Sequence, residues 1–362
     1  MSQNVIVRKR LQGMAGKEFN GGGRHTTKSA KEVGMKRLCL NLLASACGIG
    51  LSGMSAVTLA SEVYPARPVQ VIVPLTAGSV IDLLARALTD AMAKANPQAN
   101  FIVLNREGAS GVIGTSLIAR AKADGYTLGF GGDSTVSVQP HVVKDIAYSI
   151  ESFEFICQVV DAPLMFVVGP NSPYRTLEEL VEAARKLPKP LAYGTTGHAS
   201  TPHLLGESVA RESGVKFVHI PFRSVADMNT QTINGSVDFT ITLPNILTLG
   251  RGVRALAVSA DEPMVSLPAI PPLKALGWQK SAFSTIHLLY APRGLPTEAL
   301  RWLRSACADA VGSSIFHSMT VRTHTVPRHN DGESLQAWMR QAHQSHGERV
   351  RRIEMQGELS GR

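Results

Sequence analysis

The chain of 362 residues contains only four cysteines. Cys39 and Cys47 lie among residues 1–60, which leaves Cys157 and Cys307 in the remainder. No Cys-x-x-Cys pair and no His-x-x-x-His spacing occurs, so the sequence predicts no metal site. Cys157 falls in an apolar strand-like run and Cys307 on a predicted helix. An oxidising compartment would permit a disulfide between them, but we expect two buried free thiols.

Signatures of catalysis and of cofactor binding are also absent. No Gly-x-Ser-x-Gly nucleophile elbow occurs, and no acidic residue is linked by spacing to the candidate base His198. Gly111-x-x-Gly114 lacks the first spaced glycine and the acidic partner of a dinucleotide-binding fingerprint. We therefore expect a protein that is not an enzyme and takes no cofactor. An enzyme on the same scaffold, with Ser79 or His198 as nucleophile or base, is the competing hypothesis.

An excess of positive charge is missing from most of the chain, although the formal net charge is +9. Residues 1–60 carry nine Lys and Arg against two acidic residues, whereas residues 61–362 carry 28 against 26. A nucleic-acid-binding protein needs basic residues gathered on its folded part. The sequence therefore predicts no nucleic-acid partner.

The N-terminal region has no uninterrupted apolar run of the length that a permanent membrane span needs. Residues 35–60 begin with basic residues, continue as an apolar segment interrupted by Asn41 and by Gly and Ser, and end in small residues before Ser61. This is the pattern of a cleaved signal peptide, and it predicts a periplasmic protein.

Two features in front of the expected cleavage site need an interpretation. Residues 1–34 are polar and Gly-rich, and we interpret them as a non-native extension that precedes the true start at Met35. Ala44-Ser-Ala-Cys47 resembles a lipoprotein cleavage site, but Ala44 stands where Leu is usual. We expect simple cleavage, with lipid attachment at Cys47 as the alternative.

Two turns share one pattern, in which a strand is followed by Gly, Ser and Thr residues and then by a helix. The first runs from Pro74 to Asp82, and the second from Gly194 to His203. Such a turn presents unpaired backbone N–H groups and the positive end of a helix, which together suit an anion. We expect the two turns to hold the two ends of one acidic ligand.

The order of the strands and helices predicts an α/β protein of two lobes, each a mostly parallel sheet flanked by helices. We place the first lobe at residues 61–168 and 287–362 and the second at 169–286. Two strands that end in proline, 166–170 and 287–292, would form a two-strand hinge between the lobes. The charged helix 332–354 is expected to cover the first lobe.

An ordered set of motifs within residues 62–356 resembles the substrate-binding receptors of tripartite tricarboxylate transporters, the Bug-type family. The motifs are Tyr64-Pro-x-Arg-Pro68, Val73-Pro74-x4-Ser79-x2-Asp82, Asn105-Arg106-x-Gly108-Ala109-x-Gly111-x2-Gly114, Asp124-Gly-Tyr-Thr-Leu128, Tyr193-x3-Gly197-x4-Pro202-His-Leu204, Val218-His-Ile-Pro221-Phe222, Gly235-x-Val-Asp238 and Arg254-Ala-Leu-Ala-Val258. The resemblance implies a two-lobed, type II-like periplasmic-binding-protein (Venus flytrap) fold that closes on a small carboxylate ligand. It also implies delivery of that ligand to the membrane permease subunits of the transporter. We expect a monomer, and a receptor that feeds a signalling protein instead is the alternative.

The chain departs from the family pattern near the expected site. The first turn usually reads Pro-Phe-x-Pro-Gly-Gly in the family, and here Leu75 replaces the aromatic residue and Ser79 replaces a glycine. Thr242 stands where the family often has Asp. These differences predict that the ligand preference of this chain differs from the one usual in the family.

The candidate ligand-binding residues lie mainly on the two turns. Asp82 is better interpreted as a cap of its own turn, because a bare carboxylate would repel an anionic ligand. His198 is the better contact candidate in the second turn, whereas His203 would pack or cap inside the helix. Arg223 either pairs with a second carboxylate or is solvated. The full candidate set is Leu75, Thr76, Ala77, Gly78, Ser79, Asp82, Ser134, Thr135, Thr196, Gly197, His198, Ala199, Ser200, Thr201, Phe222 and Thr242.

Overall fold

A computed structural model describes residues 63–354, except 261 and 284. The predicted extension (1–34), signal peptide (35–60) and lipidation site (Cys47) lie outside these residues. The elements in chain order are β1 (Val69–Val73), α1 (Val80–Ala95), β2 (Phe101–Asn105), η1 (Ala109–Gly111), α2 (Val112–Ala119), β3 (Thr127–Gly132), α3 (Ser134–Ser137), η2 (Gln139–His141), η3 (Ile150–Ser152), β4 (Phe153–Asp161), β5 (Met165–Val168), α4 (Leu177–Lys186), β6 (Leu191–Thr195), α5 (Thr201–Ser213), β7 (Phe217–Pro221), α6 (Val225–Ile233), β8 (Phe239–Thr242), η4 (Pro244–Leu249), β9 (Arg254–Val258), β10 (Ile286–Pro292), α7 (Thr297–Val311), α8 (Ser314–Thr323), β11 (Val326–Asp331) and α9 (Gly332–Glu354).

The first sheet has the strand order β11-β4-β10-β3-β1-β2. Strand β1 lies parallel to β2 and β3, and Val71 is paired with Val103 on one side and Leu128 on the other. Helices α1 and α7 pack with the apolar side chains of one face, and α2 and α9 with those of the other. Because both faces are covered, β1 is an almost continuous run of buried Val and Ile.

The second sheet has the strand order β7-β6-β8-β5-β9. Strand β6 is parallel to β7 and β8, whereas β5 is antiparallel to β8 and β9. Helices α4 and α5 supply the core of this sheet together with Tyr193 and Phe239, whose rings stack with centroids 5.3 Å apart. The expected two-lobed α/β fold is confirmed, but both sheets are mixed rather than mostly parallel.

The boundary between the lobes differs from the predicted one. The segment 165–168 was assigned to the first lobe, but as strand β5 it pairs only within the second sheet. The chain therefore crosses between the sheets at residues 162–164, not after 168, and returns just before β10. The two crossing segments are joined where Ala162 N donates to Thr285 O at 2.9 Å. The predicted hinge strand 166–170 was thus wrong, whereas β10 does begin at the crossing.

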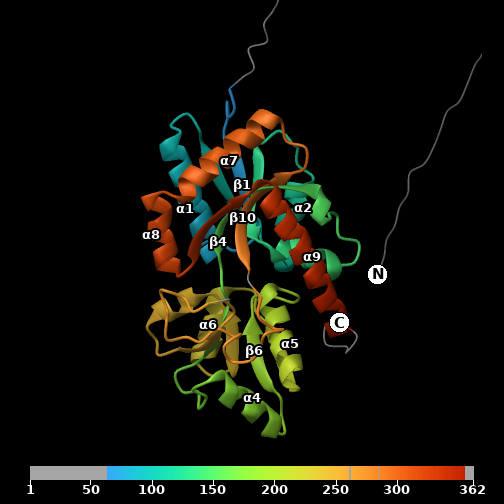
Figure 1. Cartoon of the computed structure of the whole chain (residues 1–362), viewed down its shortest axis with the longest axis vertical. Helices are drawn as coiled ribbons and strands as arrows, with labels where there is room; N and C mark the ends of the chain where they lie inside the picture. Colours follow the sequence, from blue (N-terminus) through green and yellow to red (C-terminus); the bar gives the residue numbers. More distant parts are fainter. Residues whose placement is uncertain (1–62, 261, 284, 355–362) are drawn as a thin grey trace, which may run out of the picture. The chain divides into compact units, whose positions relative to one another are not determined.

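Helix α9 covers the first lobe, as expected, but its last turns extend to the second (Figure 1). Val350 and Ile353 pack with Leu204 of α5, and the Arg211 guanidinium of α5 donates to the backbone oxygen of Arg352. The lobes are therefore connected at the two crossing segments and also through the C-terminal part of α9.

Cys157 and Cys307 form a disulfide, which contradicts the expectation of two free thiols. Cys157 lies on β4 and Cys307 on α7, and both side chains are fully buried in the first-lobe core. Helix α7 packs on β4 with the two Cα atoms 6.6 Å apart, a separation that a disulfide can span. The bridge ties the helix to the sheet.

Candidate functional site

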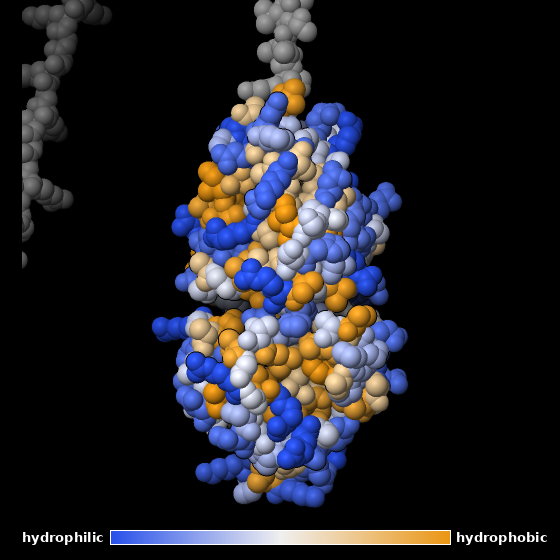
Figure 2. All heavy atoms as spheres, turned by 90° about the vertical axis from the view of Figure 1, so that its left-hand side faces the viewer, coloured by the Kyte–Doolittle hydropathy of each residue, from blue (hydrophilic) through white to orange (hydrophobic). Residues whose placement is uncertain are grey.

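A cavity of about 560 Å³ lies between the two sheets. Its walls come from segments that follow the carboxyl ends of β1 and β3 in the first lobe and of β6, β7 and β8 in the second. Figure 2 shows apolar surface on both lobes beside the furrow that separates them. Open α/β sheets place ligand sites outside the carboxyl ends of their parallel strands, which is where this cavity lies.

The first predicted turn lines the cavity with every residue from Leu75 to Ser79. Ser79 is the N-cap of α1, and its hydroxyl accepts a hydrogen bond from Asp82 N at 3.3 Å. The next two residues, Val80 and Ile81, also line the cavity, and N–H groups at these helix positions have no intrahelical acceptor. The positive end of a 16-residue helix is therefore directed at the cavity.

Asp82 is one of the candidate ligand-binding residues, but it does not line the cavity. It caps its own turn, the role that the sequence favoured over a ligand contact. Its carboxylate accepts hydrogen bonds from Gly78 N at 2.9 Å and from Asn105 Nδ2 at 3.0 Å, and it pairs with Arg86 at 3.0 Å. Burial alone would raise the pKa of Asp82, but the hydrogen bonds from Arg86, Gly78 N and Asn105 outweigh it and lower the pKa. The N–H of Gly78 is thus already used by Asp82.

The second predicted turn lines the cavity with Thr196, Ser200 and Thr201. Ser200 is the N-cap of α5, but its hydroxyl donates to Gly197 O at 2.8 Å instead of capping the helix. Thr201 is 3% exposed, and its hydroxyl has no hydrogen-bond partner among the described residues. A buried hydroxyl without a partner at a helix N-terminus is well placed to bind a ligand oxygen.

Three residues of this turn, Gly197, His198 and Ala199, were predicted to bind the ligand but lie beside the cavity at a contact between the lobes. Ser110 Oγ donates to His198 O at 3.2 Å, and Gln139 Nε2 donates to Ala199 O at 3.2 Å. Gly197 has a φ of +143°, which favours glycine, and a Cβ atom on it would lie 2.5 Å from Ser110 Oγ, so the hydroxyl that bonds to His198 would have to move. These backbone groups hold the lobes together.

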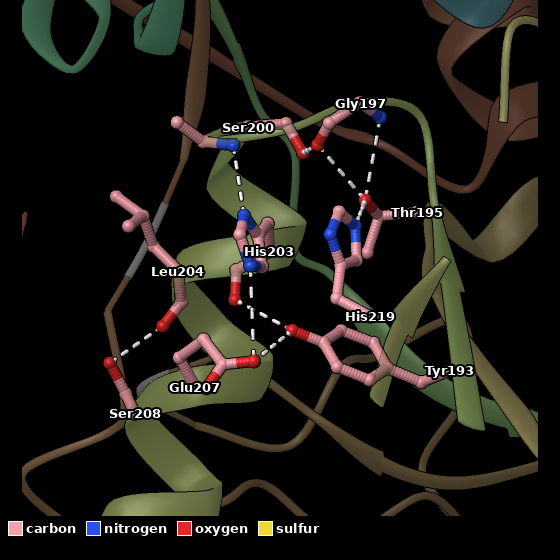
Figure 3. A network of polar contacts seen from close by, with 10 residues as sticks. Tyr193, Thr195, Gly197, Ser200, His203, Leu204, Glu207, Ser208 and His219 are labelled. Carbon is pink, nitrogen blue, oxygen red and sulfur yellow. Dashed lines mark hydrogen bonds and ion pairs between the residues drawn. The ribbon is translucent and has the colours of Figure 1, made fainter. Parts of the chain in front are cut away.

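His198 belongs to a group of three histidines with His203 and His219, and the candidate ligand nitrogens of the group lie within 4.8 Å of one another. The rings of His203 and His219 stack with centroids 3.8 Å apart (Figure 3). Burial, followed by the neighbouring His219 and His198, lowers the pKa of His203 to about 2. Burial, followed by His198, lowers the pKa of His219 to about 4. These two imidazoles are therefore neutral at pH 7.

The hydrogen bonds of the group decide whether it can hold a metal ion. Ala199 N donates to His203 Nδ1 at 2.9 Å, so the lone pair of the neutral imidazole is occupied and its proton is on Nε2. Thr195 Oγ1 donates to Gly197 O at 3.1 Å and therefore accepts from His219 Nε2 at 2.7 Å. Only His219 Nδ1 and His198 keep a lone pair for a metal, which is too few for a stable site. His203 is the internal cap that the sequence predicted.

Of the remaining predicted residues, some line the cavity and one does not. Ser134, Thr135 and Thr242 line the cavity, from α3 and from the end of β8. Phe222 does not line it, because its ring lies over the backbone of Gly194, where a Cβ atom would be 2.9 Å from Phe222 Cε2.

Sequence reasoning missed cavity residues on several further segments. Asn229 and Thr230 lie on α6, Arg251 follows η4, and Thr285 and His287 lie where the chain returns to the first sheet. Helix α6 carries the same signal as α1, since the Ser224 hydroxyl accepts from Asp227 N at 3.1 Å after the end of β7. That signal could have identified α6 as a third wall. The wall near β10 depends on antiparallel pairing that is not visible locally.

The charges around the cavity have one sign. The described lining residues include no Asp or Glu, but they include Arg223 and Arg251, which are both exposed, and many hydroxyl and amide groups. Apolar side chains fill the space between the polar groups, and the bulkiest of them are Leu75, Ile81, Leu164, Ile233, Ile241, Leu243 and Leu249. The arrangement suits an anion that carries a hydrocarbon segment.

None of the helices within residues 63–354 combines the length and the apolar character needed to cross a membrane, with 261 and 284 left out of the search.

Comparison with known proteins gives a family and a set of related folds. The sequence profile described as "Tripartite tricarboxylate transporter family receptor" matches residues 84–354. A UPF0065 protein of Bordetella bronchiseptica is 32% identical over 277 residues, which cover 74% of this chain and 82% of that protein. The solved periplasmic binding protein BugD is similar with a TM-score of 0.73 and 26% identity, covering 80% of this chain and 99% of BugD. An R. palustris protein solved with adipate is similar with a TM-score of 0.72 and 26% identity, covering 80% of this chain and 97% of that one.

Proposed function

Because the chain belongs to the family of tripartite tricarboxylate transporter receptors, we propose that it captures a small carboxylate between its lobes and delivers it to the permease of such a transporter. The observation that carries this proposal is the cavity bounded by the N-termini of α1 and α5, one from each lobe, with no acidic residue among its described lining residues. Two positive helix ends with nearby hydroxyl groups and arginines attract an anion. The family is one of solute-binding receptors, and we propose that the chain catalyses no reaction.

The ligand that fits best is a dicarboxylate with an apolar middle. Each turn would bind one carboxylate, and the aliphatic residues between them would cover a hydrocarbon segment. Leu75, which replaces the aromatic residue usual in the family, lines the cavity and widens the space for that segment. Adipate, present in a structurally similar protein, has this chemistry. Binding would stabilise the closed arrangement of the lobes, since only that arrangement brings both turns to the ligand.

A thermal-shift screen of the protein with C4 to C8 dicarboxylates, aromatic acids and amino acids tests the proposal. A ligand at 100 times its Kd stabilises the folded state by about 2.7 kcal/mol, which raises the melting temperature by several degrees. A stabilising dicarboxylate is the expected result. If only uncharged or cationic compounds stabilise the protein, the carboxylate proposal is wrong. Mass spectrometry of the incubated ligand would reveal any product and so contradict the absence of catalysis.

Gly78→Asp is expected to weaken dicarboxylate binding by about 100-fold or more, as measured by calorimetry, because it places a carboxylate in the anion site. A side chain at this position meets nothing within 4 Å, so no steric clash accounts for the effect. Gly78→Asn is the matched control, because it has the same size and the same strain at φ +79° without the charge. Equal affinity of the two variants would remove the first turn from the site.

Export is a separate proposal. We propose that residues 35–60 are removed as a signal peptide, so that the periplasmic protein begins near Ser61 and functions as a monomer. Intact-mass measurement of the protein recovered from the periplasm tests the cleavage, and sedimentation of the same protein tests the monomer. A mass that includes residues 1–34 would contradict it.

A further inference from the structure

One titratable side chain in the wall of the cavity has no assigned role. His287 is the second residue of β10, paired with Gly132 of β3 on one side and with Val160 of β4 on the other. Its side chain is 3% exposed and lines the cavity. The position was not among those that the sequence predicted to bind a ligand.

The surroundings of the ring distinguish its two nitrogens. His287 Nδ1 is buried and has no hydrogen-bond partner among the described residues. A proton on Nδ1 would be an unsatisfied donor, so the favoured tautomer carries its proton on Nε2. Nε2 lies close to Gly132, where an added Cβ atom would be 3.9 Å from it. Gly132 itself lines the cavity, and its lack of a side chain leaves Nε2 open on this side.

Two hydroxyl groups beside His287 are already used as donors. Thr285 and Thr135 line the cavity, but the Thr285 hydroxyl donates to Asp133 Oδ1 at 2.7 Å and the Thr135 hydroxyl donates to Gly132 O at 3.2 Å. His287 Nε2–H is therefore a donor that a ligand can use at this end of the cavity, together with the Ser134 hydroxyl.

The imidazole is uncharged in the physiological pH range. Burial alone lowers the pKa of His287 to about 3, so the ring is neutral at pH 7. The charged and titratable groups on the elements around it have other partners. Asp133, at the end of β3, accepts from Thr285 and Ile286, and it lies 4.0 Å from His346 of α9. Asp161 of β4 is paired with Arg328 of β11, and the cavity arginines are exposed.

We propose that His287 is a ligand-binding, specificity-determining residue whose Nε2–H donates a hydrogen bond to an acceptor oxygen of the bound molecule. The proposal rests on the function proposed above and adds to it a requirement on the ligand. An acceptor must lie at the end of the cavity beside Gly132, so a molecule with a methyl group at that end is disfavoured. A neutral donor binds a carboxylate without taking up a proton. His287 therefore does not make the affinity depend on pH.

The experiment measures adipate binding to the protein by calorimetry, or binding of the tightest dicarboxylate of the screen if that is another one. His287→Leu, which has no donor, is expected to weaken binding 10- to 100-fold, whereas His287→Gln, which keeps an N–H near Nε2, stays within tenfold of the wild type. His346→Gln is the matched control, because His346 is a buried neutral histidine of the same lobe that does not line the cavity. It should leave the affinity unchanged.

A spectroscopic measurement separates direct binding from a structural role. In long-range ¹H–¹⁵N spectra of the histidine rings, the His287 signal, identified by its absence in His287→Gln, should show the Nε2–H tautomer and move when the ligand is added. Wild-type affinity in His287→Leu, or an unmoved His287 signal on binding, overturns the inference and leaves the proposed function intact. If no carboxylate of the screen binds the wild type, both proposals fail.

Discussion

Lowering the pH from 7 to 5 is expected to reduce the free energy of unfolding by a net amount of about 6 kcal/mol. The cause is a set of neutral histidines, His203, His219, His287 and His346, whose pKa values burial lowers to about 2, 4, 3 and 3. In the unfolded chain they titrate near pH 6.5. Below that pH the unfolded state binds protons that the folded state does not, so stability present above pH 6.5 is lost as the pH falls.

Asp133 acts in the opposite direction. Burial raises its pKa to about 6 against the hydrogen bonds from Thr285 and Ile286, so at pH 5 the folded state holds a proton that the unfolded state releases. This offsets about 1 kcal/mol of the loss between pH 7 and 5. His346 is linked to Asp133 through Ser137, whose Oγ lies 3.0 Å from His346 Nδ1 and 3.2 Å from Asp133 Oδ2.

Urea unfolding at several pH values tests this expectation. His203→Asn keeps an acceptor for Ala199 N but does not titrate, so the slope of stability against pH should fall by one proton, about 1.4 kcal/mol per pH unit. His317→Gln changes an exposed histidine and should leave the slope as it is. A free energy of unfolding that is flat between pH 5 and 7 would show that these rings are not buried and neutral.

Reduction of the Cys157–Cys307 disulfide is expected to lower the free energy of unfolding by about 4 kcal/mol. The bridge joins residues 150 apart in the sequence, so its loss frees a long loop in the unfolded chain. Urea unfolding with and without a reductant measures the effect. The Cys157→Ala/Cys307→Ala variant is the control, because a reductant should not change its midpoint. If the wild-type midpoint stays constant while alkylation shows both thiols to be free, the bridge does not stabilise the fold.

Much of the site could be predicted from local sequence patterns, because each of the two turns is continuous in sequence. Strand, small polar residues and helix follow one another at Leu75 to Ser79, and this order alone places a helix N-terminus at the end of a strand. The cap made by Asp82 could also be predicted, since its partners Gly78 and Arg86 lie four residues away on either side.

Features that depend on distant pairing were not predictable in this way. The apolar run of β5 looks like a continuation of the first lobe, and only its pairing with β8 and β9 assigns it to the second. The disulfide depends on α7 packing across β4. The position of His198 in the turn predicts a ligand contact. In the structure Ala199 has a φ of +51°, and the chain there faces Ser110 and the other histidines.

The contact between α9 and α5 limits how the lobes can move. We expect the lobes to turn about a line from the crossing segments to the contacts on the α9 side, where Val350 packs with Leu204 and Gln139 Nε2 donates to Ala199 O. Helix α9 lies on one face of the first sheet, whereas α1, α7 and α8 lie on the other. We expect the furrow between the lobes to open on the side of α1 and α8, so that solute enters and leaves there. The side of α9 is expected to stay closed.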